Sequence, residues 1–222
     1  MFDPDKYVEE LIAECKKSFA ERLLYVGLQG SYLRGEAKES SDIDIMVIID
    51  DLSVRDMDEY RSILEKIGYT EKSCGFICGR NEMTKWNPQE VCQLHHTTKD
   101  LLGRLDDYLP EATRKDEIDY VKISLGNLYH EFCHRYIHGG KEKSRQKFRG
   151  SCKAVFFLLQ NLHYLESGNF VLTKRGLKEA LSEKDRHILM MTELPDDYDF
   201  DAAFHETMEW CREVFDRIDR LS

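Results

Sequence analysis

Residues 30–44 read GSYLRGEAKESSDID and connect two apolar stretches, Leu23–Leu28 and Ile43–Ile49. Both stretches have the length and composition of buried strands. A strand that runs into a Gly-Ser pair and then a helical turn presents unpaired backbone N–H groups, a serine hydroxyl and the Arg34 side chain to an anion. Glycine at such a turn lets the anion approach the backbone closely. The pattern predicts a phosphate-binding loop between two strands.

Two aspartates follow this loop at the start of the second strand. Asp42 and Asp44 are two residues apart, so both carboxylates project from one face of the strand while Ile43 points into the core. Carboxylate oxygens suit Mg²⁺, which completes its shell with water and substrate phosphates. A Gly-Ser turn or an aspartate pair alone is most often structural. Together they indicate metal-dependent attack on a nucleoside triphosphate, in which a second ion can clamp the attacking and leaving oxygens.

The combined pattern of GS at 30–31, an arginine three residues later and SDID at 41–44 resembles the signature of the nucleotidyltransferase superfamily typified by DNA polymerase beta. The resemblance implies that a nucleoside monophosphate, AMP from ATP, is transferred to a hydroxyl group and that pyrophosphate leaves. It assigns metal binding and catalysis to Asp42 and Asp44, and triphosphate binding to Gly30, Ser31 and Arg34.

Strand signals stop after Leu109-Pro110, and long helical patterns follow. The whole chain resembles kanamycin and other antibiotic nucleotidyltransferases. The resemblance implies an α/β catalytic domain with a mixed sheet at 1–110 and an all-α helical bundle at 111–222. Periodicity predicts helices at 4–21, 57–67, 113–138, 144–166, 177–181, 185–191 and 202–221, and two further strands at 75–78 and 91–95.

The helical half contributes three candidate site residues by the same resemblance. Related enzymes place an acid on a helix as general base and a basic residue four positions later near the nucleotide, which nominates Glu131 and Arg135. The alternative is an ordinary surface ion pair. A phosphate-binding lysine in a loop nominates Lys174, and the alternative there is that Thr173 caps a helix followed by solvated bases.

The third carboxylate that the superfamily usually supplies from the next strand is missing. The corresponding residues 71–78 read EKSCGFIC. Glu71 at the edge of that strand and Glu90 on the next strand are weak substitutes. A catalytically weak or inactive nucleotide-binding protein, similar to the nucleotidyltransferase half of toxin–antitoxin pairs, therefore remains an alternative to an enzyme.

The charge balance bears on the partners. Forty-two acidic and 32 basic residues give a net charge of −10, which repels phosphate backbones and disfavours a long nucleic acid. We expect a nucleoside triphosphate and a small hydroxyl-bearing acceptor, similar to an aminoglycoside by resemblance alone. A polynucleotide-adding enzyme is disfavoured because neither half has a basic tract with interleaved aromatics.

Cysteine and histidine patterns add little chemistry. Seven cysteines without paired metal-ligand spacing suggest reduced thiols in the cytoplasm, and no apolar run approaches the roughly 20 residues of a membrane helix. His130, His134 and His138 share a helix face, but the outer pair is about 12 Å apart along the axis, too far for one ion. His95 and His96 are expected on opposite faces of a strand. The oligomeric state stays open, a homodimer included.

Overall fold

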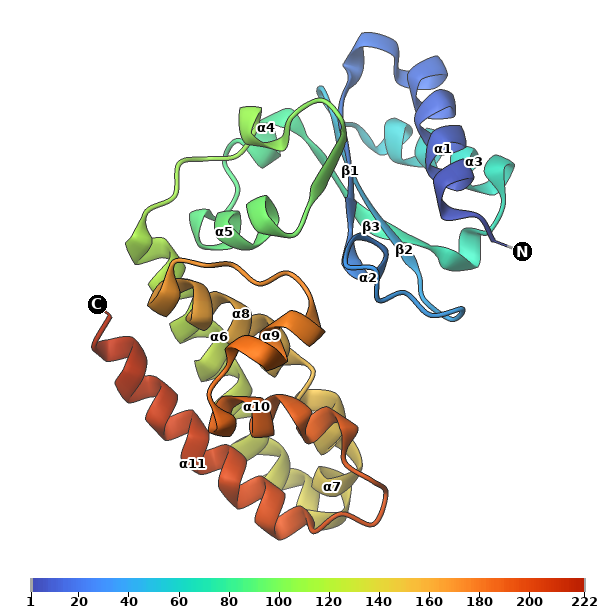
Figure 1. Cartoon of the computed structure of the whole chain (residues 1–222). Coiled ribbons are helices and arrows are strands. Elements are labelled where there is room, and N and C mark those ends of the chain that lie inside the picture. Colours follow the sequence, from blue (N-terminus) through green and yellow to red (C-terminus); the bar gives the residue numbers. More distant parts are fainter. Residues whose placement is uncertain (1, 222) are drawn as a thin grey trace. The chain divides into compact units, whose positions relative to one another are not determined.

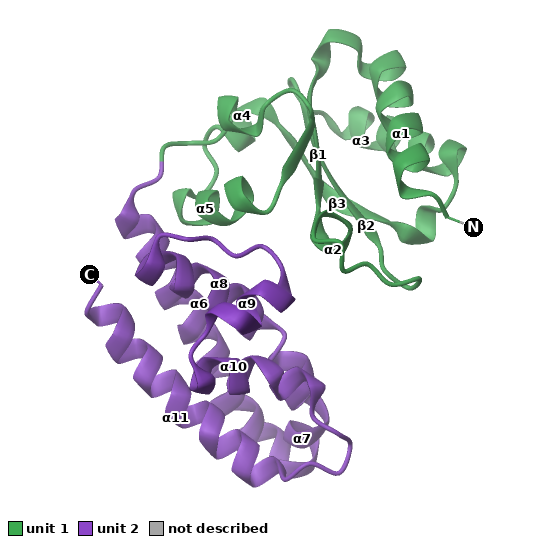
Figure 2. Cartoon of the chain, viewed as in Figure 1, with its two compact units in different colours: residues 1–111 green, residues 112–222 purple. Residues whose placement is uncertain are grey.

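The computed structural model describes residues 2–221, which belong to two compact units, residues 1–111 and 112–222 (Figure 2). Unit 1 contains a β-sheet covered by helices, whereas unit 2 is built from helices (Figure 1). This arrangement confirms the fold class predicted from the sequence.

Within residues 2–221 there is one sheet of four strands: β1 (Leu23–Gln29), β2 (Ile43–Ile49), β3 (Ser73–Gly79) and β4 (Lys99–Leu102). Their spatial order is β3-β2-β1-β4. β1 is antiparallel to both β2 and β4, and β2 is parallel to β3, so the sheet is mixed. The two strands that flank the motif are therefore central, and β3 and β4 form the edges.

Helices α1 (Pro4–Phe19) and α3 (Val54–Ile67) cover one face of this sheet (Figure 1). Asp3 caps α1 ahead of Pro4, and Ser53 forms a capping box with Asp56 at the start of α3. The core beneath them contains alternate residues of β2, as expected for a strand with a period of two. These are Ile43, Ile45, Val47 and Ile49.

The opposite face of the sheet carries Met46 and Ile48 of β2 and packs with residues near α4 (Arg80–Met83) and α5 (Pro88–His96). Asp44 alternates with the α1–α3 core positions and therefore lies on this second face. The shorter elements of unit 1 are α2 (Gly30–Leu33) and the 3₁₀ turns Ala20–Arg22, Thr70–Lys72 and Leu105–Asp107.

The strand predicted at 91–95 is wrong, because these residues belong to α5. Asn87 accepts a hydrogen bond from the Gln89 N–H and Pro88 occupies the first turn, so the segment starts as a capped helix. The fourth strand is β4 instead. His95 and His96 consequently lie at the end of a helix, with ring centroids 4.9 Å apart, and not on opposite faces of a strand.

Unit 2 packs its helices around a core that includes the fully buried Trp210. The indole N–H of Trp210 donates to Asp185 Oδ1 at 2.8 Å, and Arg217 pairs with the same carboxylate. The helices are α6 (Arg114–His134), α7 (Gly140–Ser151), α8 (Ala154–Ser167), α9 (Lys174–Ala180), α10 (Glu183–Leu189) and α11 (Phe200–Asp219), with a 3₁₀ turn at Met190–Glu193.

Two predicted helix extents in unit 2 need correction. The helix predicted at 113–138 is α-helical only to His134 and continues as a π-helical turn, Arg135–Gly139. The helix predicted at 144–166 is divided into α7 and α8 at Cys152-Lys153.

All seven cysteines are free thiols. Within residues 2–221 there is no helix both long and apolar enough to cross a membrane.

Candidate active site

The loop after β1 brings Gly30 against Asp44. The antiparallel register pairs Gln29, the last residue of β1, with Asp44 of β2. Gly30 begins the short helix α2 with a φ of 67°. A Cβ atom at position 30 would lie only 1.8 Å from Oδ2 of Asp44. Glycine is therefore required here for two separate reasons, the positive φ and the neighbouring carboxylate.

The helical turn α2 offers hydrogen-bond donors beside that carboxylate. The first N–H groups of a helix have no partner within it. The Ser31 hydroxyl makes no hydrogen bond with any residue in 2–221. Arg34, at the end of the turn, is only 17% exposed and is ion-paired with Glu36, with 3.0 Å between Nε and Oε2. Triphosphate binding by Arg34 would have to share the guanidinium with Glu36, and it stays a prediction.

Asp42 and Asp44 have carboxylate oxygens that no basic side chain within residues 2–221 neutralises. Asp42 is exposed and Asp44 is partly buried, and neither makes an ion pair with any residue in 2–221. No set of three His, Cys, Asp or Glu side chains among the described residues is placed to hold a metal ion. Two carboxylates fit Mg²⁺, which commonly binds through one or two carboxylates together with water and phosphate oxygens.

Cys74 occupies the position beside Asp44 on the neighbouring strand. The parallel register pairs the two residues, so the Cys74 thiol lies on the same face of the sheet as the Asp44 carboxylate. Burial, and then the charge of Asp44, raise the pKa of this thiol. Glu71 lies in the 3₁₀ turn before β3, and Glu90 accepts a hydrogen bond from Trp86 on α5. Neither glutamate joins the two aspartates in a three-residue cluster.

The remaining predicted site residues lie in unit 2. Glu131 of α6 and Arg135 of the π-helical turn form an ion pair with 2.5 Å between Oε1 and Nη1, and each side chain is 39% exposed. Lys174 donates to Thr192 and pairs with Glu193, while Thr173 caps α9. The ion pair considered as the alternative for Glu131 and Arg135 is therefore present, and so is the Thr173 helix cap considered for Lys174. Their catalytic roles stay predictions.

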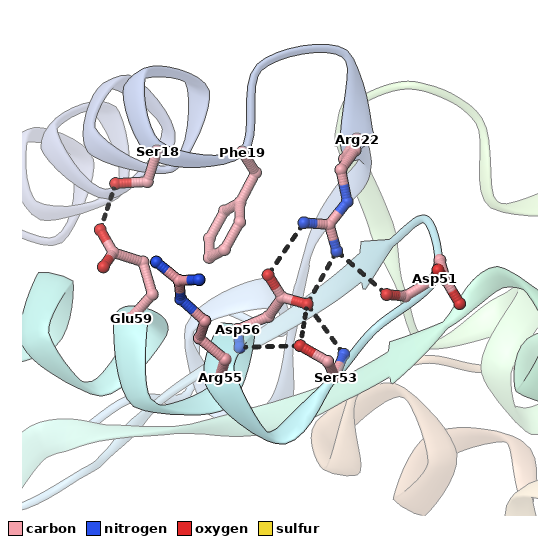
Figure 3. Close-up of a pocket in the computed structure, with 8 residues that line it drawn as sticks. All are labelled: Ser18, Phe19, Arg22, Asp51, Ser53, Arg55, Asp56 and Glu59. Carbon is pink, nitrogen blue, oxygen red and sulfur yellow. Dashed lines mark hydrogen bonds and ion pairs between the residues drawn. The ribbon is translucent and has the colours of Figure 1, made fainter.

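A cavity of about 620 Å³ lies at the other end of β2 (Figure 3). Arg22 crosses it and donates to both carboxylate oxygens of Asp56. Arg22, and then Ser53, hold the pKa of Asp56 far below its usual range. Asp51, whose backbone oxygen also accepts from Arg22, lies two residues beyond the end of β2, whereas Asp42 precedes this strand. This cavity is therefore separate from the motif, and the sequence motif gave no signal for it.

Comparison with known proteins identifies the family. A sequence model described as a nucleotidyltransferase domain matches residues 8–78. A Methanocaldococcus jannaschii protein, provisionally assigned as a protein adenylyltransferase, is 40% identical over 70 residues, which are 31% of this chain and 67% of that protein. The chain belongs to the nucleotidyltransferase domain family. Membership in the nucleotidyltransferase family, which the motif predicted, is thereby confirmed.

This chain matches a smaller share of two other relatives. The protein adenylyltransferase MntA of Thermococcus cleftensis is 39% identical over 66 residues, 29% of this chain and 59% of MntA. A second M. jannaschii protein with the same provisional assignment is 39% identical over 54 residues, 24% of this chain, and this chain spans only 37% of it.

One solved structure matches the whole chain. The spectinomycin adenyltransferase AAD(9) of Enterococcus faecialis, solved with ATP and spectinomycin, aligns with a TM-score of 0.57. The alignment covers 98% of this chain and 100% of that chain at 14% identity. The two proteins share a fold, which agrees with the predicted antibiotic-nucleotidyltransferase plan.

Proposed function

We propose that this nucleotidyltransferase moves AMP from ATP to a hydroxyl group and releases pyrophosphate. The observation that carries this proposal is the close approach of Gly30 and Asp44, which sets a carboxylate without a basic partner in the described residues beside the first amides of α2. Phosphate oxygens would accept from these amides and from the Ser31 hydroxyl. Asp42 and Asp44 would hold a metal ion that also binds phosphate oxygens.

The metal ion proposed here is Mg²⁺, which when bound neutralises charge on the triphosphate and polarises its phosphoryl oxygens. Asp44 is the second residue of β2 and Asp42 directly precedes the strand, and with the extended alternation of side chains both carboxylates would point toward one ion. Gly30 leaves room for the Asp44 carboxylate, and the register of β1 with β2 fixes that carboxylate opposite the turn.

The proposed reaction forms one bond and breaks one bond. The acceptor oxygen bonds to the α-phosphorus, and the bond from that phosphorus to the bridging oxygen of the β-phosphate breaks, so pyrophosphate leaves with the electron pair. The hydroxyl proton passes to a base, for which Glu131 is our candidate, while Arg135 and Lys174 are candidate phosphate contacts. In each of these roles the residue would have to exchange its present partner for a substrate.

The acceptor is proposed to be either a small molecule or a protein. Sequence resemblance favours a small hydroxyl-bearing molecule, and the shared fold is that of a spectinomycin-modifying enzyme at low identity. The relatives near 40% identity, which match part of this chain, carry the name protein adenylyltransferase, and this favours a protein hydroxyl.

The test is transfer of label from ATP labelled at the α-phosphate, with Mg²⁺, to a panel of aminoglycosides and hydroxyl-bearing proteins. We expect a labelled acceptor with the natural chain and with Asp58→Asn, a control at an exposed surface pair. Asp44→Asn should abolish labelling. Labelling that survives Asp44→Asn would contradict the metal assignment. A melting temperature raised by magnesium and ATP without any labelled acceptor would favour the nucleotide-binding regulatory protein.

A further inference from the structure

The outer edge of β3 has no partner strand within residues 2–221. β3 lies at the end of the sheet order and pairs with β2 along its whole length, from Ser73 to Gly79. Cys74 and Gly75 on this edge are exposed. An unpaired strand edge presents a row of backbone N–H and C=O groups that another extended chain can pair with.

This edge passes directly beside the two aspartates. The register sets Cys74 directly beside Asp44, and paired residues of neighbouring strands have their side chains on the same face of the sheet. A strand added to β3 would therefore present every second side chain on the face that carries Asp44. Its backbone would lie two strand spacings, about 9.6 Å, from β2, so a long side chain is needed to bring a hydroxyl to the site.

A small cavity of about 270 Å³ borders the same strand on the other face. Tyr60 and Leu64 of α3 line it together with Ile45, which points toward the α1–α3 core. Gly75 contributes backbone alone, and a Cβ there would lie 2.0 Å from the Ile45 carbonyl oxygen. The cavity is smaller than the roughly 300–1,000 Å³ of small-molecule sites, so it suits one apolar side chain.

The net charge of unit 1 indicates the sign of the charge that a binding partner should carry. Residues 1–111 contain 23 acidic and 14 basic side chains, whereas residues 112–222 contain 19 and 18. Almost all of the net negative charge therefore belongs to the unit that contains β3. A segment with basic residues would be attracted to this unit, and an acidic one would be repelled.

We propose that the free edge of β3 binds an extended, basic polypeptide segment as an added strand, and that this segment carries the acceptor hydroxyl. The proposal rests on the nucleotidyl transfer proposed above. Because side chains alternate between faces, the hydroxyl residue lies on the Asp44 face and its direct neighbour enters the cavity between Tyr60 and Leu64. The acceptor segment thus has an apolar residue immediately next to the hydroxyl residue.

Two peptides of identical composition test this alternation. One is acetyl-Lys-Gln-Val-Tyr-Val-Gln-Lys-amide, and the other, acetyl-Lys-Val-Gln-Tyr-Gln-Val-Lys-amide, moves valine away from tyrosine. Binding is measured by fluorescence anisotropy with Mg²⁺ and a non-hydrolysable ATP analogue, and AMP transfer from ATP is measured by mass spectrometry. We expect the first peptide to bind about tenfold tighter, since valine burial is worth more than 1.4 kcal/mol, and to be adenylylated.

Backbone pairing is tested by methylating each peptide N–H in turn. Loss of binding at every second position is expected, because alternate N–H groups of an edge-paired strand face the partner. Leu64→Lys should abolish the preference between the peptides, while Met57→Lys, at an exposed position of the same helix, should retain it. Circular dichroism and the thermal shift with magnesium and ATP verify that both variants fold.

Equal binding of the two peptides, or binding of neither, would overturn the proposal. So would adenylylation of small-molecule acceptors without adenylylation of the preferred peptide, or sedimentation data showing that a second copy of the chain covers β3. These outcomes leave nucleotidyl transfer intact. Failure of the proposed function would look different, because no acceptor of any class would then be adenylylated while peptide binding still showed the alternation.

Discussion

The two ends of β2 carry the same residue type in opposite circumstances. At its start, Asp42 and Asp44 make no ion pair with any described residue. Beyond its end, Asp56 is held by Arg22 at 2.7 Å, and Asp50 is paired with Arg80 at 3.3 Å.

This difference indicates that the partners of a carboxylate, and not its place along a strand, determine whether the carboxylate stabilises the fold or is available to bind a ligand. An aspartate neutralised by arginine and by a helix cap stabilises the fold, as Asp56 does. Two aspartates without a basic partner among the described residues can instead serve as ligands of a divalent metal. Variants at the two ends should therefore affect different observables.

The largest expected effect is on catalysis at the start of β2. Asp44→Asn should lower AMP transfer at least about a hundredfold, because several kcal/mol of charge stabilisation are lost with the metal ligand. The melting temperature should change little, since Asp44 makes no ion pair in the described part of the chain. Initial rates and thermal unfolding check the two parts separately. A large loss of stability with unchanged transfer rates would show that Asp44 has a structural role and not a catalytic one.

Gly30→Ala should reduce transfer at least about tenfold by displacing the Asp44 carboxylate. Gly35→Ala is the matched control, because Gly35 has a φ of 68° but no atom within 4 Å of the added Cβ. Both variants suffer the same backbone strain, roughly 1–2 kcal/mol. Rates that fall equally in the two variants would show that strain, and not the contact with Asp44, is responsible.

At the other end of β2, Asp56→Ala should lower the free energy of unfolding by about 1–3 kcal/mol, because the Asp56 carboxylate loses the bonds that it accepts from the Ser53 backbone N–H and from Arg22. Transfer measured well below the melting temperature should persist. Asp58→Ala, at an exposed pair with Arg61, should change stability by less than about 0.5 kcal/mol. Urea unfolding of the three proteins provides the measurement, and equal stabilities would contradict the account.

A smaller effect concerns pH. The lowered pKa of Asp56 means that its ionised form stabilises the fold above the unfolded-state pKa of about 3.9, and that this contribution is lost as pH falls. The stability difference between the natural chain and Asp56→Asn should therefore shrink between about pH 5 and pH 2. A difference that stays constant over this range would show that the charge of Asp56 is not the stabilising feature.

Sequence periodicity identified the central part of unit 1 because strong local signals agree there. Buried apolar runs produce β1 and β2, and α3 ends at Ile67, as predicted. The strand predicted at 91–95 failed because a short apolar run also fits a helix, and the Asn87-Pro88 start decided the outcome. β4 has four residues with charges at its exposed start, so no periodicity could reveal it.

The candidate site was partly readable from the sequence. Spacing predicted that Asp42 and Asp44 share a face, but the closeness of Asp44 to Gly30 depends on the register of β1 with β2, a long-range property. The arginine partners of the acids beyond β2 come from outside the motif and were not visible. Cys74 was visible only as a missing acid, and its place beside Asp44 depends on the register of β2 with β3.

The central claim is that the acids at the start of β2, and not those at its end, bind a metal with the triphosphate. The most direct measurement is electron paramagnetic resonance of Mn²⁺, a substitute for Mg²⁺, titrated with the protein and a non-hydrolysable ATP analogue. The account predicts protein-bound Mn²⁺ with the natural chain and with Asp50→Asn/Asp51→Asn, and loss of it in Asp42→Asn/Asp44→Asn. Equal Mn²⁺ binding in all three proteins would contradict it.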